Sequence, residues 1–319
     1  MEQRQSRVEN MEGLNVLVTG ANGFLGSWLC NSLKGNVYAL KKEDIKHSML
    51  DEKRVTILNG DVTNARFIED AIKKHSIGMC VHLAAQTIVG EANKNPLPTI
   101  ETNVMGTVNV LEASRKLGVK VVIASSDKAY GEQALPYVEG MPMKGLHPYD
   151  ASKSCADLLA QTYYNTYGIP VAITRLANIF GPGDTNFSRI VPSASLAIAK
   201  DEKPIIRSDG SPVRQYIYVE DAVSGYMELI EKMNAGKCFG EAFNFGSTEP
   251  LSVYEMVKNI MKAASMQGEP IIKGERTKGE IQEQYLSSKK AKKMLGWKPA
   301  VSLEEGLKRT LAWYAKVFA

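Results

Sequence analysis

Short apolar runs rich in β-branched residues alternate with amphipathic stretches over the first half of the chain. The apolar runs predict buried strands at 14–19, 37–40, 55–58, 79–83, 121–124 and 171–176. Between them, apolar residues at helical spacing predict helices at 24–33, 67–74, 103–117 and 149–167. Because strands that alternate with helices form parallel sheets with helices on both faces, we expect an α/β protein with a doubly wound parallel sheet.

A glycine-rich turn joins the first predicted strand to the first predicted helix. Gly20 permits a tight turn, Gly23 allows the backbone to approach a pyrophosphate, and Gly26 lets the helix pack on the strand. The amides at the helix start would then face phosphate oxygens, which predicts a Rossmann-type site for a nicotinamide dinucleotide. The acidic residue that usually binds the ribose 2′-hydroxyl is missing after the second strand. Lys41 and Lys42 stand there instead, so NADP remains open beside NAD.

The second half of the chain has a looser pattern. It predicts helices at 190–199, 220–232, 253–264, 288–295 and 303–316, and short strands at 205–206 and 213–219. We expect a flexible leader at 1–12, a Rossmann domain at 13–177 to which segments around 214–246 return, and a mainly substrate-binding domain at 178–319. The second domain would cover the carboxyl edge of the sheet, where ligands of such sheets bind.

Composition argues against several classes of protein. The chain has 39 Lys and Arg against 35 Asp and Glu, and the net charge of +4 is too small and dispersed to predict a nucleic-acid partner. Its four cysteines are widely spaced without a CxxC or a paired His, so we expect no metal site. No segment resembles a signal peptide or a bilayer span, which predicts a soluble cytoplasmic protein without membrane contact.

A tyrosine and a lysine lie one helical turn apart in the second long helix. Tyr149 and Lys153 therefore share a helix face. The ammonium group, together with the positive charge of a nicotinamide, would lower the phenol pKa from about 10 toward neutrality and make Tyr149 a base. Ser126 follows the fifth predicted strand, so its hydroxyl should converge with Tyr149 at the carboxyl edge of the sheet. His82 and His147 are expected to be a packed core residue and a surface residue, respectively.

With these motifs the chain resembles the extended short-chain dehydrogenase/reductases, the NAD-dependent epimerases and dehydratases of nucleotide sugars. The resemblance runs from Leu14 to the C-terminus. Its further marks are Gly60-Asp-Val62, His82-Leu-Ala-Ala85, Asn103-Val-x-Gly-Thr107, Arg175-x-x-Asn178-x-x-Gly-Pro-Gly183, Arg214-x-Tyr216-x-x-Val219-x-Asp221 and Leu295-Gly-Trp-Lys-Pro299.

The resemblance implies NAD as cofactor and a role for each matching position. The cofactor-binding residues would be Gly20, Asn22, Gly23, Phe24, Leu25, Gly26, Asp61, Val62, Leu83, Ala84, Ala85, Asn103, Tyr149 and Lys153. The diphosphate of a nucleotide-sugar substrate would be bound by Asn178, Arg189, Arg214 and Arg276. The family also implies a homodimer through a four-helix bundle, formed by apolar stripes on the two long helices.

The residues after the catalytic hydroxyl separate the reactions of this family. Sugar 4,6-dehydratases carry an acid followed by Glu or Lys there, and Asp127-Lys128 is of that type, most similar to the CDP-glucose 4,6-dehydratases. We therefore expect conversion of an NDP-hexose to its 4-keto-6-deoxy form by an internal NAD redox cycle. Asp127 would protonate the leaving C6 hydroxyl and Lys128 would remove the C5 proton, for which its pKa must fall. The catalytic residues would be Ser126, Asp127, Lys128, Tyr149 and Lys153.

Two alternatives remain open from the sequence. A nucleotide-sugar 4-epimerase of the UDP-glucose/galactose type would use the same Ser126, Tyr149 and Lys153 but return the hydride to C4. A non-catalytic nucleotide-binding member would keep the fold without turnover, although the joint presence of these three residues counts against it.

Overall fold

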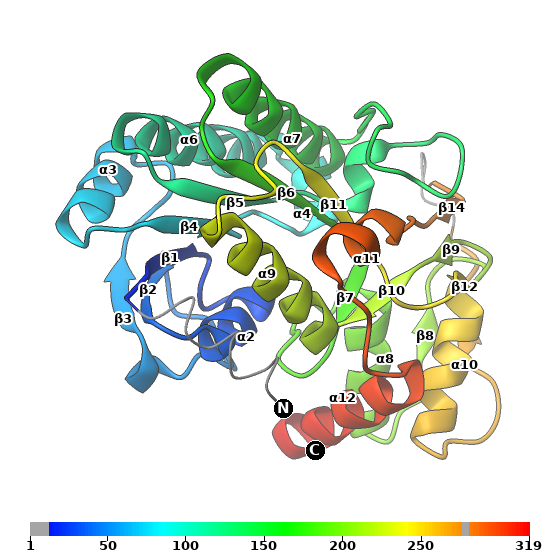
Figure 1. Cartoon of the computed structure of the whole chain (residues 1–319). Helices are drawn as coiled ribbons and strands as arrows, with labels where there is room; N and C mark the ends of the chain where they lie inside the picture. Colours follow the sequence, from blue (N-terminus) through cyan, green and yellow to red (C-terminus); the bar gives the residue numbers. More distant parts are fainter. Residues whose placement is uncertain (1–12, 276–280) are drawn as a thin grey trace.

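The computed structural model describes residues 13–275 and 281–319, so the predicted leader at 1–12 and Arg276 lie outside the described residues. Within these ranges seven strands form one parallel sheet in the order β11-β6-β5-β4-β1-β2-β3 (Figure 1). The strands are β1 (Asn15–Thr19), β2 (Asn36–Lys41), β3 (Thr56–Asn59), β4 (Met79–His82), β5 (Lys120–Ala124), β6 (Val171–Leu176) and β11 (Ala242–Phe245). The predicted doubly wound parallel sheet is confirmed.

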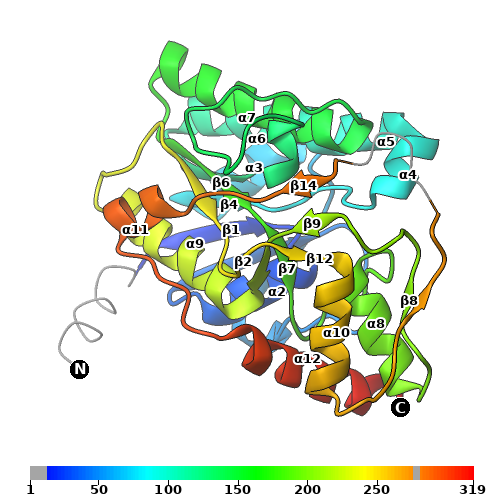
Figure 2. The same ribbon diagram turned by 90° about the vertical axis from the view of Figure 1, so that its right-hand side faces the viewer.

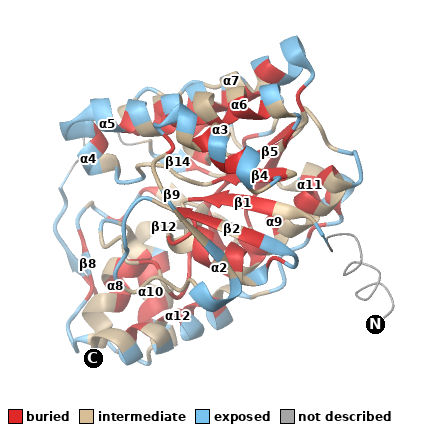
Figure 3. Cartoon of the chain, turned by 90° about the vertical axis from the view of Figure 1, so that its left-hand side faces the viewer, coloured by how far each residue is buried: buried red, intermediate tan, exposed pale blue. Residues whose placement is uncertain are grey.

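Helices cover both faces of this sheet (Figures 1 and 2). One face carries α3 (Ala65–Lys74), α6 (Gly106–Leu117) and α7 (Pro148–Tyr167). The other carries α2 (Phe24–Ser32), α9 (Val219–Asn234) and α11 (Lys289–Leu295). The inner strands are buried between these layers, the edge strand β3 is only partly buried, and the outer helix faces are exposed (Figure 3). Burial on both sides explains why the strands read as continuous apolar runs rather than alternating ones.

Several short elements were not apparent from the sequence pattern. They are η1 (Glu52–Arg54), α4 (Val89–Lys94), α5 (Pro96–Ile100), η2 (Glu101–Met105) and η3 (Asp127–Tyr130). The helix predicted at 103–117 therefore begins with the π-helical turn η2, and only α6 is regular α-helix.

A smaller layer lies beside the carboxyl ends of the sheet (Figure 2). Its helices are α8 (Ile190–Ala199), α10 (Val253–Ala263) and α12 (Leu303–Phe318). Its strand pairings are β7 (Asn178–Phe180) with β10 (Tyr216–Tyr218), β8 (Ile205–Ile206) with β13 (Ile271–Ile272), and β9 (Val213–Arg214) with both β12 (Leu251–Ser252) and β14 (Glu283–Gln284). The single strand predicted at 213–219 is wrong, because β9 and β10 pair in different sheets and α9 already begins at Val219.

The order of the strands reverses between β1 and β4, and this reversal locates the ligand crevice. In doubly wound sheets the strands on either side of such a point send their connections to opposite faces, which opens a crevice at their carboxyl ends. The smaller layer is fastened next to it by Trp28 of α2, whose indole Nε1 donates to the Pro182 carbonyl at 2.8 Å. Across the described ranges, no helix combines the length and the apolarity needed to cross a bilayer.

Candidate active site

A cavity of about 880 Å³ opens at the carboxyl ends of β1, β4, β5 and β6. Segments from both halves of the chain form its wall, including the glycine-rich turn and the first turn of α7. The sequence-predicted site residues that line it are Gly20, Asn22, Gly23, Phe24, Leu25, Gly26, Leu83, Ala84, Ala85, Ser126, Asp127, Lys128, Tyr149, Lys153, Asn178, Arg189 and Arg214. The fold thus brings the proposed cofactor, catalytic and substrate positions to one place.

Three predicted cofactor residues are not among those that line the cavity. The carboxylate of Asp61 pairs with the Lys42 ammonium at 2.8 Å, and Val62 is buried in the core beneath α6. The side chain of Asn103 is also buried. Its amide accepts from the backbone N–H of Gln86 at 2.8 Å and donates to the Gln86 carbonyl at 3.0 Å. Asn103 therefore holds the segment after β4 in place from a buried position outside the cavity.

The glycine-rich turn has the local geometry that a pyrophosphate requires. Gly20 has φ +66°, and a Cβ at this position would lie 2.9 Å from the backbone of Ala84. At Gly26 a Cβ would collide with the Gly20 carbonyl. Helix α2 follows Gly23, and no described side chain caps its first turn. The amides of that turn therefore remain available to an anion in the cavity.

Tyr149 lies buried at the start of α7, within the cavity wall. Burial raises the pKa of its phenol to about 12. The Arg189 guanidinium and a hydrogen bond with Ser126 oppose this shift, whereas the carboxylates of Asp127 and Asp150 add to it. The lowered pKa predicted from the sequence is therefore not reached with the chain's own residues, because burial outweighs the neighbouring positive charge.

Lys153 lies one turn further along α7. Its ammonium donates to the backbone carbonyl of Ala124, at the end of β5, over 2.8 Å. Burial lowers the pKa of Lys153 to about 8, and the carboxylate of Asp157 limits that fall. The ammonium is thus directed to the point where β5 meets the cavity.

The turn η3, which packs against α7, presents Asp127 and Lys128 to the same cavity. Ser126 caps this turn, because its Oγ accepts from the Lys128 amide at 3.2 Å and donates to Asp127 Oδ1 at 3.0 Å. Asp127 is only 2% exposed, and within the described part of the chain its Oδ2 has no hydrogen-bond partner. A buried carboxyl oxygen without a partner is costly. This atom is therefore available to a substrate group in the cavity.

Gln284, Arg207 and His147 are among the cavity residues that were not predicted as site residues from the sequence. Gln284 of β14 accepts from the Lys128 ammonium at 3.4 Å and donates to the Asp127 carbonyl at 3.3 Å. Arg207 and His147 also line the cavity, and His147 is half-buried there. No sequence motif marks these three positions, because they come from loops and short strands that only the fold brings here.

The fold and the cavity define a dinucleotide-dependent enzyme of the extended short-chain dehydrogenase/reductase class. Within that class, the chain belongs to the GDP-mannose 4,6 dehydratase family, whose model matches residues 17–310. The resemblance predicted from the motifs is confirmed.

The relatives include both dehydratases and epimerases. A candidate UDP-glucose 4-epimerase of Methanocaldococcus jannaschii is 33% identical over 93% of this chain and 97% of its own length. The CDP-glucose 4,6-dehydratase of Salmonella typhimurium is 31% identical over 95% of this chain and 91% of its own length. The structure of dTDP-glucose 4,6-dehydratase from Bacillus anthracis, solved in complex with NAD, matches with a TM-score of 0.84 and 26% identity, covering 96% of this chain and 97% of that one. Membership therefore indicates an enzyme that modifies nucleotide sugars, and the reaction has to be argued from the site.

Proposed function

We propose that this protein is an NAD-dependent nucleotide-sugar 4,6-dehydratase. It would convert an NDP-hexose of the CDP-glucose kind to the NDP-4-keto-6-deoxyhexose. The observation that carries the proposal is the presence of Asp127 and Lys128 in the same cavity as Tyr149. An elimination across C5 and C6 needs an acid and a base in addition to the group that acts at C4, whereas a 4-epimerisation does not.

The glycine-rich half of the cavity suits NAD. The turn from Gly20 to Gly26 would hold the pyrophosphate. At the end of β2, the Lys41 ammonium is 2.7 Å from both Asp44 and Glu52, and Lys42 is paired with Asp61. Both lysines that could have bound a 2′-phosphate are thus neutralised by neighbouring carboxylates. This pairing supports NAD over NADP.

The substrate would lie between the two parts of the chain, with its diphosphate beside the cationic wall. Arg189, Arg207 and Arg214 line this side of the cavity together with Asn178. Guanidinium groups bind phosphate oxygens through two parallel hydrogen bonds, so they fix orientation as well as charge. The predicted partner Arg276 lies outside the described residues.

The first half of the reaction would use α7. When bound, NAD would accept the hydride of C4 and later supply it to C6. Tyr149 would take the proton of the C4 hydroxyl, with the Ser126 hydroxyl as its hydrogen-bond partner. Lys153 would hold the nicotinamide ribose. Because burial sets the Tyr149 pKa at about 12, the phenol has to be activated when cofactor and substrate bind.

The second half would use η3. The 4-ketone acidifies C5, and Lys128 would remove its proton while Gln284 holds the amine in place. The electron pair of the C5–H bond forms a C5–C6 double bond as the C6–O bond breaks. Asp127 would give its proton to the departing oxygen, which leaves as water. A hydride at C6 and a proton at C5 complete the product, so the net change is the loss of one water.

The test is incubation of the purified protein with CDP-glucose, and in parallel with UDP-, dTDP- and GDP-linked hexoses. A 4-keto-6-deoxy product is recognised by its absorbance at alkaline pH. Tyr149→Phe should abolish product formation, and Asp127→Asn should lower it by about 10²-fold or more while oxidation at C4 persists. Full dehydration by Asp127→Asn, with Tyr149→Phe inactive, would show that the assigned elimination role is wrong.

A nucleotide-sugar 4-epimerase is the second candidate. It is favoured by the similarity to the Methanocaldococcus jannaschii protein, which is 33% identical. Ser126, Tyr149 and Lys153 would serve that reaction equally well. In the same incubations an epimerase yields the 4-epimer, detected by chromatography, and no product that absorbs at alkaline pH.

A further inference from the structure

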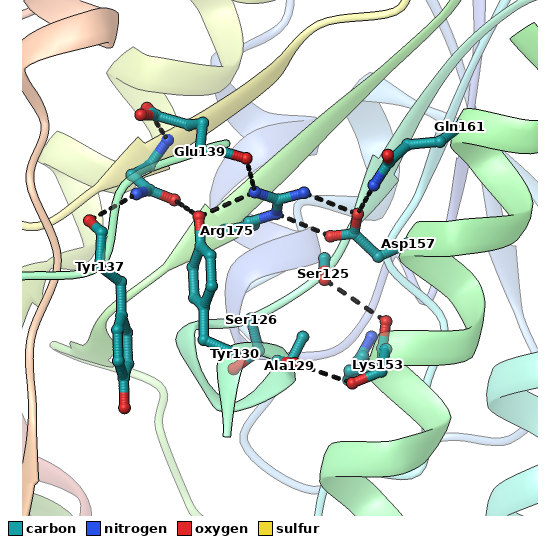
Figure 4. Close-up of polar contacts among 12 residues, drawn as sticks. Ser125, Ser126, Ala129, Tyr130, Tyr137, Glu139, Lys153, Asp157, Gln161 and Arg175 are labelled. Carbon is teal, nitrogen blue, oxygen red and sulfur yellow. Dashed lines mark hydrogen bonds and ion pairs between the residues drawn. The ribbon is translucent and has the colours of Figure 1, made fainter. Parts of the chain in front are cut away.

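A buried ion pair lies directly behind the candidate active site (Figure 4). Arg175 of β6 meets Asp157 of α7 through two parallel contacts, from Nε to Oδ2 and from Nη2 to Oδ1, each 2.8 Å long. The two side chains are 2% and 0% exposed. Gln161, one turn along α7, also donates to Asp157 Oδ1 at 2.7 Å. Asp157 follows Lys153 by one helical turn, so the pair is fixed to the helix that carries Tyr149 and Lys153.

The same guanidinium reaches the turn that carries the proposed acid and base. Nη1 of Arg175 donates to the hydroxyl of Tyr130 at 2.8 Å and to the carbonyl of Glu139 at 2.9 Å. Tyr130 is the last residue of η3 and is fully buried. Its hydroxyl donates onward to Asn244 Oδ1 of β11 at 2.8 Å. The Asn244 amide then donates to the Tyr137 carbonyl at 3.1 Å.

Arg175 therefore connects α7 and η3, the two elements whose relative position the proposed reaction depends on. On one side it holds α7 through Asp157, and on the other it holds η3 through Tyr130. Neither Arg175 nor its two partners are among the residues that line the cavity, so they act through others. A buried ion pair is not needed for stability alone, because apolar residues of similar volume often stabilise a fold equally well. What an ion pair adds is the fixed geometry of its hydrogen bonds.

We propose that Arg175 is a positioning residue, which clamps η3 to α7 and so fixes Asp127 and Lys128 relative to Tyr149. The inference rests on the proposed function, in which those three side chains act on one sugar ring. A displacement of about 1 Å at a reacting group can cost a large factor in rate, so a loosened clamp should lower kcat before it weakens substrate binding.

Tyr130→Phe is the sharper test variant. Removal of Arg175 would leave Asp157 as an unpaired buried charge, which commonly prevents folding. Tyr130→Phe removes only the hydroxyl between Arg175 and Asn244 and keeps the ring stacked on Tyr137, whose centroid is 4.8 Å away. The matched control is Tyr163→Phe. It deletes a tyrosine hydroxyl of α7, which donates to Glu112 Oε1 of α6 at 2.7 Å and is not part of the Arg175 network.

Two measurements decide the proposal. In steady-state kinetics, Tyr130→Phe should lower kcat roughly tenfold with KM changed less than about twofold, while Tyr163→Phe keeps both values. In hydrogen exchange followed by mass spectrometry, the peptide 126–131 should exchange faster in Tyr130→Phe only. Unchanged kcat, a rise in KM alone, or unchanged exchange of this peptide would overturn the proposal.

The proposed function is tested separately, by the product that the wild-type protein forms. A wild-type protein that forms the 4-epimer, or no product, overturns the dehydratase assignment. The exchange of peptide 126–131 needs no substrate, so in that case it alone decides whether Tyr130 and Arg175 hold η3: faster exchange in Tyr130→Phe supports the clamp, and equal exchange overturns it.

Discussion

His82 at the end of β4 and Thr19 at the end of β1 are joined by a hydrogen bond of 2.8 Å between Nδ1 and Oγ1. The direction of this bond follows from its neighbours. The Thr107 hydroxyl donates to the Asn103 carbonyl at 2.6 Å. Toward His82 its oxygen therefore acts as an acceptor, and it accepts from His82 Nε2 at 3.2 Å. His82 Nδ1 must then accept from Thr19, whose oxygen accepts from the Ala84 amide at 3.1 Å. A neutral imidazole satisfies every partner at the switch point of the sheet.

The first prediction concerns stability in acid. Burial lowers the pKa of His82 from 6.5 to about 3, with Lys153 adding to the effect. Between about pH 6.5 and pH 3, His82 is protonated in the unfolded chain but remains neutral in the folded chain. The contribution of His82 to the free energy of unfolding is therefore present above pH 6.5 and falls by about 1.4 kcal/mol per pH unit below it. The measurement is urea unfolding of wild type and His82→Gln at several pH values. In this window the free energy of unfolding of wild type should fall more steeply with decreasing pH, by the amount that corresponds to one proton. Equal slopes for the two proteins would contradict the neutral His82.

The second prediction concerns activity in alkali. Burial lowers the pKa of Lys153 to about 8, so its ammonium is lost as the pH rises through that value. Without this charge Lys153 would hold the nicotinamide ribose less firmly, and kcat should fall on the alkaline side. Lys153→Arg should be less active at every pH but should lose this alkaline decline, because a guanidinium stays charged. The measurement is the pH profile of kcat for both proteins. A decline that persists unchanged in Lys153→Arg would assign it to another group.

Local sequence patterns were sufficient to predict those parts of the fold and of the site that depend on residues close together in the chain. The turn from Gly20 to Gly26 and the four-residue spacing of Tyr149 and Lys153 place their residues in the cavity as a strand, a turn and a helix require. Gln284 could not be found in this way, since it reaches Lys128 across 156 positions from a strand of two residues. The direction of the Tyr149 pKa shift was also beyond the pattern, because it depends on how deeply the packed fold buries the ring.

The third prediction concerns the cationic wall of the cavity. Buried Asp184 accepts from the Asn186 amide at 3.1 Å, and its other oxygen pairs with Arg189 at 3.2 Å. Burial raises the pKa of Asp184, and Arg189 opposes this shift. Asp184→Asn keeps the shape but turns an N–H group or a weaker dipole toward Arg189, so this guanidinium should lose its fixed position. We expect KM for the nucleotide sugar to rise roughly tenfold with little change in kcat, as for a lost charge-assisted contact.

Asp201→Asn is the control for this third prediction. Asp201 is an exposed residue just after α8 that is not among the residues lining the cavity. Its replacement should leave KM unchanged. If Asp184→Asn also leaves KM unchanged, Arg189 does not depend on Asp184 for its position.

The last prediction concerns assembly. The apolar stripes predicted on the two long helices divide in the structure: Leu111 and Tyr163 pack into the core, whereas Met105 and Leu158 are 50% and 49% exposed. We propose that this exposed pair lies at the centre of a homodimer interface, where the helices of two copies form a four-helix bundle. Wild type should then sediment at twice the chain mass of 35.0 kDa, and Met105→Glu with Leu158→Glu should sediment at 35.0 kDa. Leu146→Glu, at an exposed leucine ahead of α7, is the control and should remain dimeric. A wild-type monomer, or a double variant that stays dimeric, would exclude this face as the interface.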